Sequence, residues 1–186
     1  LSAAYQLALR GHAVTVREAA PRPGGMMRYG IPSYRLPRDV LDAEIARIVA
    51  LGVEIETGST VDDLDATMSA GRYDAVFLAV GAQIGRRVEL PAGSAAHVLD
   101  AVAVLHDVAD AHPPVLGRRV AVYGGGNTAI DAARSARRLG ATDAVVVYRR
   151  TRDRMPAHES EVCEAEDEGI TCRWLSTIDR IDGEVV

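Results

Sequence analysis

The sequence predicts an α/β fold in which helices cover both faces of parallel sheets. Three observations support this prediction: segments rich in β-branched residues alternate with helical patterns, a strand passes directly into a glycine turn and a helix at 118–139, and residues 74–80 form a continuous apolar run. Such a run is typical of a parallel strand that is buried on both faces. Alternating strands and helices form right-handed βαβ units, which build parallel sheets.

The first half of the chain holds the elements of one such unit. Residues 1–10 form a helical pattern that Gly11 ends, and residues 13–18 form a short β-branched strand. A loop rich in proline and glycine covers 21–37 and leads into an amphipathic helix at 38–51. The remaining elements that we predict are a strand at 53–57, a helix at 61–70, the apolar strand at 74–80, a loop at 82–97 and a helix at 98–110.

A second unit begins after His112-Pro113-Pro114, because the two prolines interrupt the helix and no regular pattern spans them. We therefore place one domain at 1–112 and a second domain, incomplete at its C-terminus, at 115–186. The elements predicted in the second domain are strands at 118–123, 144–148 and 170–175, helices at 127–139 and 157–168, and a hairpin at 178–186 around Asp182-Gly183.

Composition excludes several classes of protein. The chain has 186 residues, a formal net charge of −5 and 48% hydrophobic residues, which suits a folded core and argues against disorder. The acidic balance argues against nucleic acid as a partner, and no apolar run approaches the ~18–20 residues that a membrane span needs. All 21 basic residues are arginine, which excludes lysine chemistry such as a Schiff base.

The titratable residues indicate no catalytic side chain and no metal site. Cys163 and Cys172 are nine residues apart, which is not the spacing of a redox-active or metal-binding pair. Free thiols fit a reducing cytoplasm, where we expect the protein to reside. We assign His158 to capping or the surface, and Asp131 to packing or helix polarity rather than to a general base. The glutamates of 159–168 are expected to form a solvated helix face, with docking of a redox partner as the alternative.

The glycine-rich segment Gly124–Ala129 carries the strongest functional signal. It lies between a strand and a helix and fits the G-x-G-x-x-G/A pattern of dinucleotide-binding sites. Gly124 allows the tight turn, Gly126 lets a pyrophosphate approach the backbone, and Ala129 keeps the helix close to the sheet. The phosphates would then lie at the helix N-terminus, where free N–H groups favour negative charge. The alternative is a glycine-rich turn that binds nothing.

The end of the next strand indicates which nucleotide is bound. An acidic residue at this place holds the 2′-hydroxyl of NAD, whereas an arginine accommodates the 2′-phosphate of NADP. Here Tyr148 is followed by Arg149 and Arg150, and Arg152 and Arg154 come shortly after. A guanidinium can bind a phosphate through two parallel hydrogen bonds. We therefore favour NADPH over NADH, with a solvated arginine cluster as the alternative.

The front half contains parts of a similar site. Glu18 ends a strand, where the ribose-binding carboxylate of a dinucleotide site belongs. Gly24 and Gly25 offer backbone without Cβ atoms for close approach of a cofactor, with a plain surface turn as the alternative. Gly81, at the end of the apolar run, is a further place where a ligand could approach. The glycine turn expected before this strand would lie upstream of Leu1.

Several short motifs extend over nearly the whole chain: 1–4 with 11–12, Glu18 with 23–25, 28–37, 80–82, 124–131, 148–156 and 161–162. Together they resemble the small (beta) subunit of NADPH-dependent glutamate synthase and its relatives, among them the flavin/NADPH half of dihydropyrimidine dehydrogenase. The stretch Arg-Tyr-Gly-Ile-Pro at 28–32, and Tyr-Arg-Arg at 148–150 with Met155-Pro156, are specific to this group.

The resemblance implies a Rossmann-like three-layer fold in which an NADPH-binding domain interrupts an FAD-binding domain. It implies an oxidoreductase that passes electrons from NADPH through FAD to iron–sulfur centres, with glutamate synthase large subunit as partner. An iron–sulfur domain, the FAD phosphate loop and the C-terminal return of the FAD domain would lie outside these residues. The alternatives are an electron-input module of a pyrimidine or formate dehydrogenase, and a non-catalytic nucleotide-binding fragment.

The resemblance also implies which residues bind the cofactors. Glu18 would bind the adenosine ribose of FAD, Val61 would offer its backbone to the adenine, and Arg35 would reach the phosphates or the ring. The other residues implied for FAD are Gly24, Gly25, Met26 and Gly81. Those implied for the NADPH pyrophosphate are Gly124, Gly125, Gly126, Asn127 and Thr128, and those implied for its 2′-phosphate are Arg149, Arg150 and Arg154.

Overall fold

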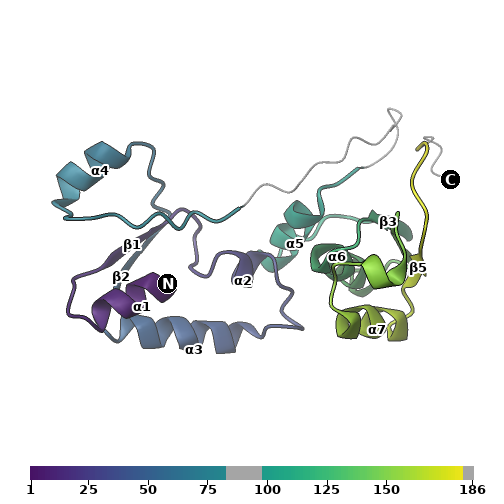
Figure 1. Cartoon of the computed structure of the whole chain (residues 1–186), viewed down its shortest axis with the longest axis horizontal. Helices are drawn as coiled ribbons and strands as arrows, with labels where there is room; N and C mark the ends of the chain where they lie inside the picture. Colours follow the sequence, from purple (N-terminus) through teal and green to yellow (C-terminus); the bar gives the residue numbers. More distant parts are fainter. Residues whose placement is uncertain (83–97, 182–186) are drawn as a thin grey trace. The chain divides into compact units, whose positions relative to one another are not determined.

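The computed structural model describes residues 1–82 and 98–181, which form two compact units (Figure 1). The first unit contains Leu1–Arg28 and Ser33–Ala82, and the second contains Tyr29–Pro32 and the described residues from 98 onward. The predicted loop at 82–97 and the hairpin around Asp182-Gly183 fall largely outside the described residues. Both units contain a parallel sheet with helices, as the sequence predicts.

The first unit is built on two parallel strands, β1 (Thr15–Glu18) and β2 (Glu54–Thr57), paired from Thr15 opposite Glu54 to Glu18 opposite Thr57. The helix α3 between them (Arg38–Val49) buries Leu41 and Ile45, which are four residues apart and therefore lie on one helix face. The other helices of the unit are α1 (Ser2–Ala8), α2 (Met26–Tyr29, of which Tyr29 belongs to the second unit) and α4 (Leu64–Gly71).

The apolar run at 74–80 corrects one prediction. The structure contains no strand there, and the side chains of Phe77 and Leu78 are 70% and 67% exposed. The prediction of a strand covered on both faces was therefore wrong. A central parallel strand needs main-chain partners and covering layers, and the described residues of this unit supply neither for this segment.

The second unit contains three parallel strands in the order β3-β4-β5: β3 (Arg119–Tyr123), β4 (Asp143–Val147) and β5 (Thr171–Arg173). Its helices are α5 (Ala101–Ala109), α6 (Asn127–Arg138), α7 (Glu159–Asp167) and the short 3₁₀ helix η1 (Arg152–Arg154). Ile130 of α6, Val146 of β4 and Val162 of α7 are almost fully buried at the centre of its core.

Helix α5 packs in the second unit, although we expected 98–110 in the first domain. Its Val104 and Leu105 are buried, and α5 contacts α6. The His106 ring stacks on the ring of Tyr29, with the ring centres 4.6 Å apart. The apolar face of α5 thus determines its placement, whereas the two prolines after it only mark where the helix ends.

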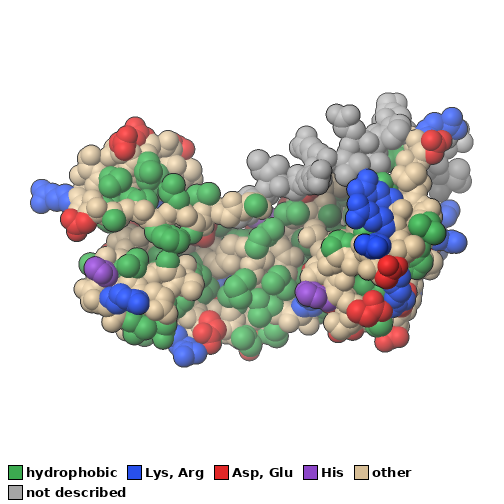
Figure 2. Space-filling model, viewed as in Figure 1, with side chains coloured by type: hydrophobic (Ala, Val, Ile, Leu, Met, Phe, Trp, Pro, Cys, Tyr) green, Lys and Arg blue, Asp and Glu red, His purple; other side chains and the backbone are tan. Residues whose placement is uncertain are grey.

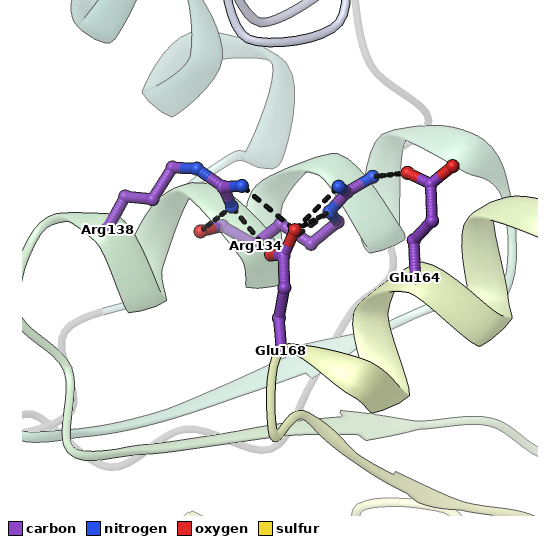
Figure 3. A network of polar contacts seen from close by, with 4 residues as sticks. All are labelled: Arg134, Arg138, Glu164 and Glu168. Carbon is purple, nitrogen blue, oxygen red and sulfur yellow. Dashed lines mark hydrogen bonds and ion pairs between the residues drawn. The ribbon is translucent and has the colours of Figure 1, made fainter.

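Helices α6 and α7 are joined by a network of ion pairs (Figure 3). Arg134 of α6, whose side chain is 5% exposed, lies 2.8 Å from a carboxylate oxygen of Glu164 and 2.6 Å from one of Glu168. Arg138 also pairs with Glu168, at 2.6 Å. Hydrogen bonds from Arg138 lower the pKa of Glu168 to about 2, against the opposing effect of burial. These glutamates bind arginines, so the helix face is less freely solvated than we predicted.

Candidate functional site

The glycine turn after β3 folds as the dinucleotide pattern requires. Gly124 has a φ of +156°, and its N–H donates to the carbonyl oxygen of Val147, at 3.1 Å. A Cβ at Gly124 would lie 3.3 Å from the Cβ of Ala129. A side chain here would therefore press α6 away from the sheet. The small size of both residues holds the start of α6 close to the ends of β3 and β4.

Gly125 is required for packing. A Cβ at Gly125 would lie 2.4 Å from the ring of Tyr148, the residue that follows β4. The Tyr148 hydroxyl donates to the carbonyl oxygen of Arg154, at 2.7 Å, and the Gly125 carbonyl accepts from the N–H of Ala157, at 3.0 Å. The ring of Tyr148 thus lies between the glycine turn and the arginine segment. Our sequence analysis missed this contact, since it joins residues far apart in the chain.

Gly126 leaves the start of α6 open. It is the N-cap residue of α6, and a Cβ built there would meet nothing within 4 Å. No side chain caps this helix end, and its first turn, which includes Thr128, contains no acidic residue. The first N–H groups of a helix have no partners within the helix, and the helix dipole adds positive potential there. This end of α6 can therefore receive an anion such as a pyrophosphate.

The side chain of Asn127 has a contact within the protein. Its Oδ1 accepts a hydrogen bond from the N–H of His158, at 3.0 Å. His158 is the N-cap residue of α7, and its own side chain makes no capping bond. Asn127 therefore ties the start of α6 to the start of α7. In this arrangement its backbone, rather than its side chain, is available to a phosphate.

The four arginines after β4 differ in what they contact. Arg149 and Arg150 are exposed, and within the described part of the chain their side chains have no ion pair or hydrogen bond. Arg154 is exposed beside the carboxylate of Asp153, at 3.6 Å. Arg152 is paired with carboxylates of α7, and its hydrogen bonds to these carboxylates raise its pKa above the usual value of an arginine. Figure 2 shows arginine side chains gathered beside acidic ones on the second unit.

Backbone hydrogen bonds bring the arginine segment to the same sheet edge as the glycine turn. The Tyr148 N–H donates to the backbone carbonyl oxygen of Arg173, at 2.9 Å, and the Leu175 N–H donates to that of Arg150, at 3.1 Å. β3 and β4 are parallel, so their carboxyl ends meet at one edge. The open start of α6 and the segment 149–154 therefore lie at this edge, where α/β proteins bind ligands.

In the first unit, Glu18 lies at the carboxyl end of β1. Its Oε1 accepts from the N–H of Ala20, at 2.9 Å, and its backbone carbonyl accepts from the N–H of Ser59, at 2.9 Å. Val61 follows β2 and is exposed. The structure thus brings Glu18 and the segment before Val61 to one end of the two-stranded sheet.

The side chain of Arg28 stabilises the turn at Gly24 and Gly25. The side chain of Arg28 is 4% exposed, its Nε donates to the carbonyl oxygen of Pro23 at 2.6 Å, and its guanidinium forms an ion pair with Asp42. A Cβ at Gly24, where φ is +128°, would lie 3.2 Å from the Cβ of Arg28, whereas one at Gly25 would meet nothing within 4 Å. Gly25 is therefore the open position of this turn.

Further basic side chains surround this turn. Burial lowers the pKa of Arg38, and the neighbouring charges of Arg28 and Arg22 lower it further. Arg38 donates to the carbonyl oxygen of Met27 at 3.2 Å. Three arginines, Arg22, Arg28 and Arg38, therefore lie close enough to affect one another's charge, with Asp42 as a nearby counter-charge. Sequence reasoning missed Arg28, because an arginine inside a motif does not reveal that it is buried.

Three other residues expected at the FAD site lie in the first unit. Met26 begins α2 and is exposed, Arg35 lies half-buried in the loop before α3, and Gly81 is exposed after the apolar run.

Both cysteines lie in the described part of the chain. Cys163 is exposed and Cys172 half-buried, and both are free. Burial raises the pKa of the Cys172 thiol, which makes the reactive thiolate rarer. Within residues 1–82 and 98–181, no group of three or more histidine, cysteine or acidic residues could hold a metal ion. Among the described helices, none has the length and apolar character to cross a membrane.

Comparison with known proteins identifies relatives. The family described as pyridine nucleotide-disulphide oxidoreductase matches residues 1–186. The beta subunit of the NADP(+)-dependent formate dehydrogenase of Moorella thermoacetica is 48% identical over 180 residues, covering 94% of this chain and 25% of that protein. A putative glutamate synthase [NADPH] small chain of Cereibacter sphaeroides is 37% identical over 186 residues, covering 95% of this chain and 45% of that protein.

A solved structure shares the fold. FprA from Mycobacterium tuberculosis, in complex with NADPH, matches 89% of this chain and 44% of its own, with a TM-score of 0.69 and 23% identity. The chain thus spans between a quarter and a half of these relatives.

Proposed function

The chain belongs to the pyridine nucleotide-disulphide oxidoreductase family, and from this premise we propose that it is part of an NADPH-dependent flavoprotein that delivers electrons to a partner subunit. NADPH supplies hydride equivalents to such a protein, and FAD accepts them. The family name includes disulphide chemistry, but the described structure shows only two free cysteines. We therefore assign no disulphide reaction to this chain.

The second unit would bind NADPH. The observation that carries this assignment is the open start of α6 at Gly126, which lies at the same sheet edge as Arg149 and Arg150, two exposed arginines that pair with no carboxylate of the described residues. The N–H groups of α6 would hold the pyrophosphate, and Arg149, Arg150 and Arg154 would hold the 2′-phosphate. Arg152 is already paired within the protein.

The first unit would supply part of an FAD site. Glu18 would accept hydrogen bonds from the adenosine ribose, with Val61 near the adenine. The backbone at Gly24, Gly25 and Met26 would line the nucleotide, with the buried Arg28 holding the turn. Arg35 and Gly81 complete the set of residues proposed for FAD.

The electron acceptor is proposed from the relatives. The motif resemblance and the putative small chain of Cereibacter sphaeroides support the small subunit of glutamate synthase, with its large subunit as partner. The higher identity to the formate dehydrogenase beta subunit supports a second candidate, an electron-input module of a formate dehydrogenase. In both cases electrons would leave through iron–sulfur centres outside these residues, in the cytoplasm.

The NADPH assignment is tested by replacing both proposed phosphate ligands. Arg149→Ala with Arg150→Ala should lower the affinity for NADPH by at least about tenfold, because charge-assisted hydrogen bonds contribute about 1.5–3 kcal/mol each. The affinity for NADH should change by less than about threefold. Binding is measured by calorimetric titration of the 186-residue chain.

A matched control comes from the opposite end of the same sheet. Arg119→Ala removes an exposed arginine at the start of β3, which pairs only loosely with Asp143, at 3.5 Å. It should leave both affinities unchanged. Equal losses of NADPH and NADH affinity in the double variant would contradict the 2′-phosphate assignment.

A further inference from the structure

Arg152 lies at the centre of a cluster of side chains to which we assign no part in binding NADPH or FAD. Its Nη2 is 2.8 Å from a carboxylate oxygen of Glu159, and its Nη1 is 3.0 Å from both carboxylate oxygens of Glu166. Its Nη2 also lies 3.5 Å from the Sγ of Cys163. All three partners belong to α7, while Arg152 belongs to η1. Arg152 therefore attaches the arginine segment to α7.

The same guanidinium also contacts the end of the sheet. It lies over the ring of Trp174, 5.9 Å from the ring centre. Trp174 in turn meets the ring of Tyr148 edge-on, with the ring centres 6.4 Å apart. The ring of Tyr148 packs on Gly125, and its hydroxyl donates to the carbonyl oxygen of Arg154. A continuous set of contacts thus runs from the glycine turn through Tyr148 and Trp174 to Arg152.

We propose that Arg152 is a positioning residue for nucleotide specificity: it holds the segment 149–154 on α7, and it neutralises Glu159 and Glu166 beside the arginines that receive a 2′-phosphate. This inference rests on the proposed NADPH site. Arg152 does not bind the phosphate itself, since its guanidinium is occupied by the two carboxylates.

The electrostatic reason for this role is that the charge of Arg152 balances negative charges beside the segment 149–154. A 2′-phosphate brings nearly two negative charges at neutral pH, comparable to those of a phosphorylated side chain. Without Arg152, the carboxylates of Glu159 and Glu166 would lie next to the segment 149–154 without this counter-charge. Charges closer than the Debye length of about 8–10 Å are only partly screened by salt. NADH lacks the 2′-phosphate, so its binding should be much less sensitive to this change.

The test compares three variants of the 186-residue chain by calorimetric titration with NADPH and with NADH. Arg152→Gln removes the positive charge, and Arg152→Gln with Glu159→Gln and Glu166→Gln removes the two carboxylates as well. Arg47→Gln is the control, because it removes the same charge from an exposed i,i+3 pair with Glu44 in the first unit.

Arg152→Gln should weaken NADPH binding by about five- to tenfold and NADH binding by less than about twofold, as expected for nearby charges that salt screens only in part. The triple variant should recover most of the NADPH affinity. Equal weakening of both nucleotides, or a triple variant that remains weak, would overturn the proposal, because either result indicates a merely structural role.

The same titration separates this inference from the proposed function. If Arg149→Ala with Arg150→Ala removes the NADPH preference while Arg152→Gln leaves it intact, the inference fails and the NADPH site stands. If the unsubstituted chain shows no preference for NADPH over NADH, the proposed 2′-phosphate site fails, and the inference fails with it.

Discussion

Alanine substitutions at Gly125 and Gly126 should separate folding from nucleotide binding. At Gly125 the new methyl would lie 2.4 Å from the Tyr148 ring, far inside normal contact distance. The ring has little room to move, because its hydroxyl binds the Arg154 carbonyl and its edge meets Trp174. At Gly126 the methyl would meet nothing within 4 Å, and the φ of −91° suits alanine.

The two substitutions therefore have different expected magnitudes. Overpacking and the loss of one hydrogen bond together lower the free energy of unfolding of Gly125→Ala by about 2–4 kcal/mol. Gly126→Ala should change it by less than about 1 kcal/mol, since alanine is only a poorer N-cap than glycine. In the complex, however, its methyl would occupy the space in which a pyrophosphate approaches α6. We expect NADPH affinity to fall by about tenfold to a hundredfold.

The assay combines urea unfolding with calorimetric titration of NADPH. Trp174 is the only tryptophan of the chain, so its fluorescence reports the unfolding of the second unit alone. If Gly126→Ala folds normally and binds NADPH like the unsubstituted chain, the start of α6 is not the pyrophosphate site. If Gly125→Ala is as stable as the unsubstituted chain, the close packing of Tyr148 on the glycine turn does not hold the site together.

Three other predictions concern charged side chains. Because the pKa of Glu168 is lowered from 4.5 to about 2, mainly by Arg138, its contribution to stability is complete above pH 4.5 and is lost as the pH falls toward 2. Glu168→Gln should lower the free energy of unfolding by about 1–2 kcal/mol at pH 7, allowing for solvent screening, and by nothing near pH 2; a pH-independent difference in urea titrations would contradict this. Arg28→Met should speed amide hydrogen exchange at Met27, whose N–H donates to the carbonyl oxygen of Gly24 at 3.2 Å, and unchanged exchange would refute the supporting role of the guanidinium. Glu18→Gln should weaken FAD binding by about tenfold in equilibrium dialysis, because it replaces a charged acceptor by a neutral one; equal affinity would refute the ribose assignment.

Most regular elements were predictable because their signals are local. β-branched runs indicated β1 to β5, and apolar spacing indicated α3 and α6 within a few residues of their observed bounds. The short helices α2 and η1 were missed, since four and three residues are too few to show a period. The run at 74–80 was misassigned because strand formation depends on partners outside the segment.

For the candidate site, the sequence by itself determined the turn and the positive charges. Gly124–Ala129 and the arginines from Arg149 are recognisable from spacing, because a tight strand-to-helix turn and a phosphate-binding charge each require particular residue types at fixed positions. The same local reasoning found Glu18 at the end of β1.

Only the tertiary structure decided which of these residues are free to bind a ligand. It pairs Arg152 with α7 and leaves Arg149 and Arg150 exposed, it fills the space at Gly125 with Tyr148 and leaves Gly126 open, and it buries Arg28 beside the turn at Gly24 and Gly25. Neighbouring arginines and neighbouring glycines are chemically alike in the sequence. They differ in the structure because ion pairs and close packing depend on groups that lie elsewhere in the chain, from Glu159, 7 positions after Arg152, to Tyr148, 23 positions after Gly125.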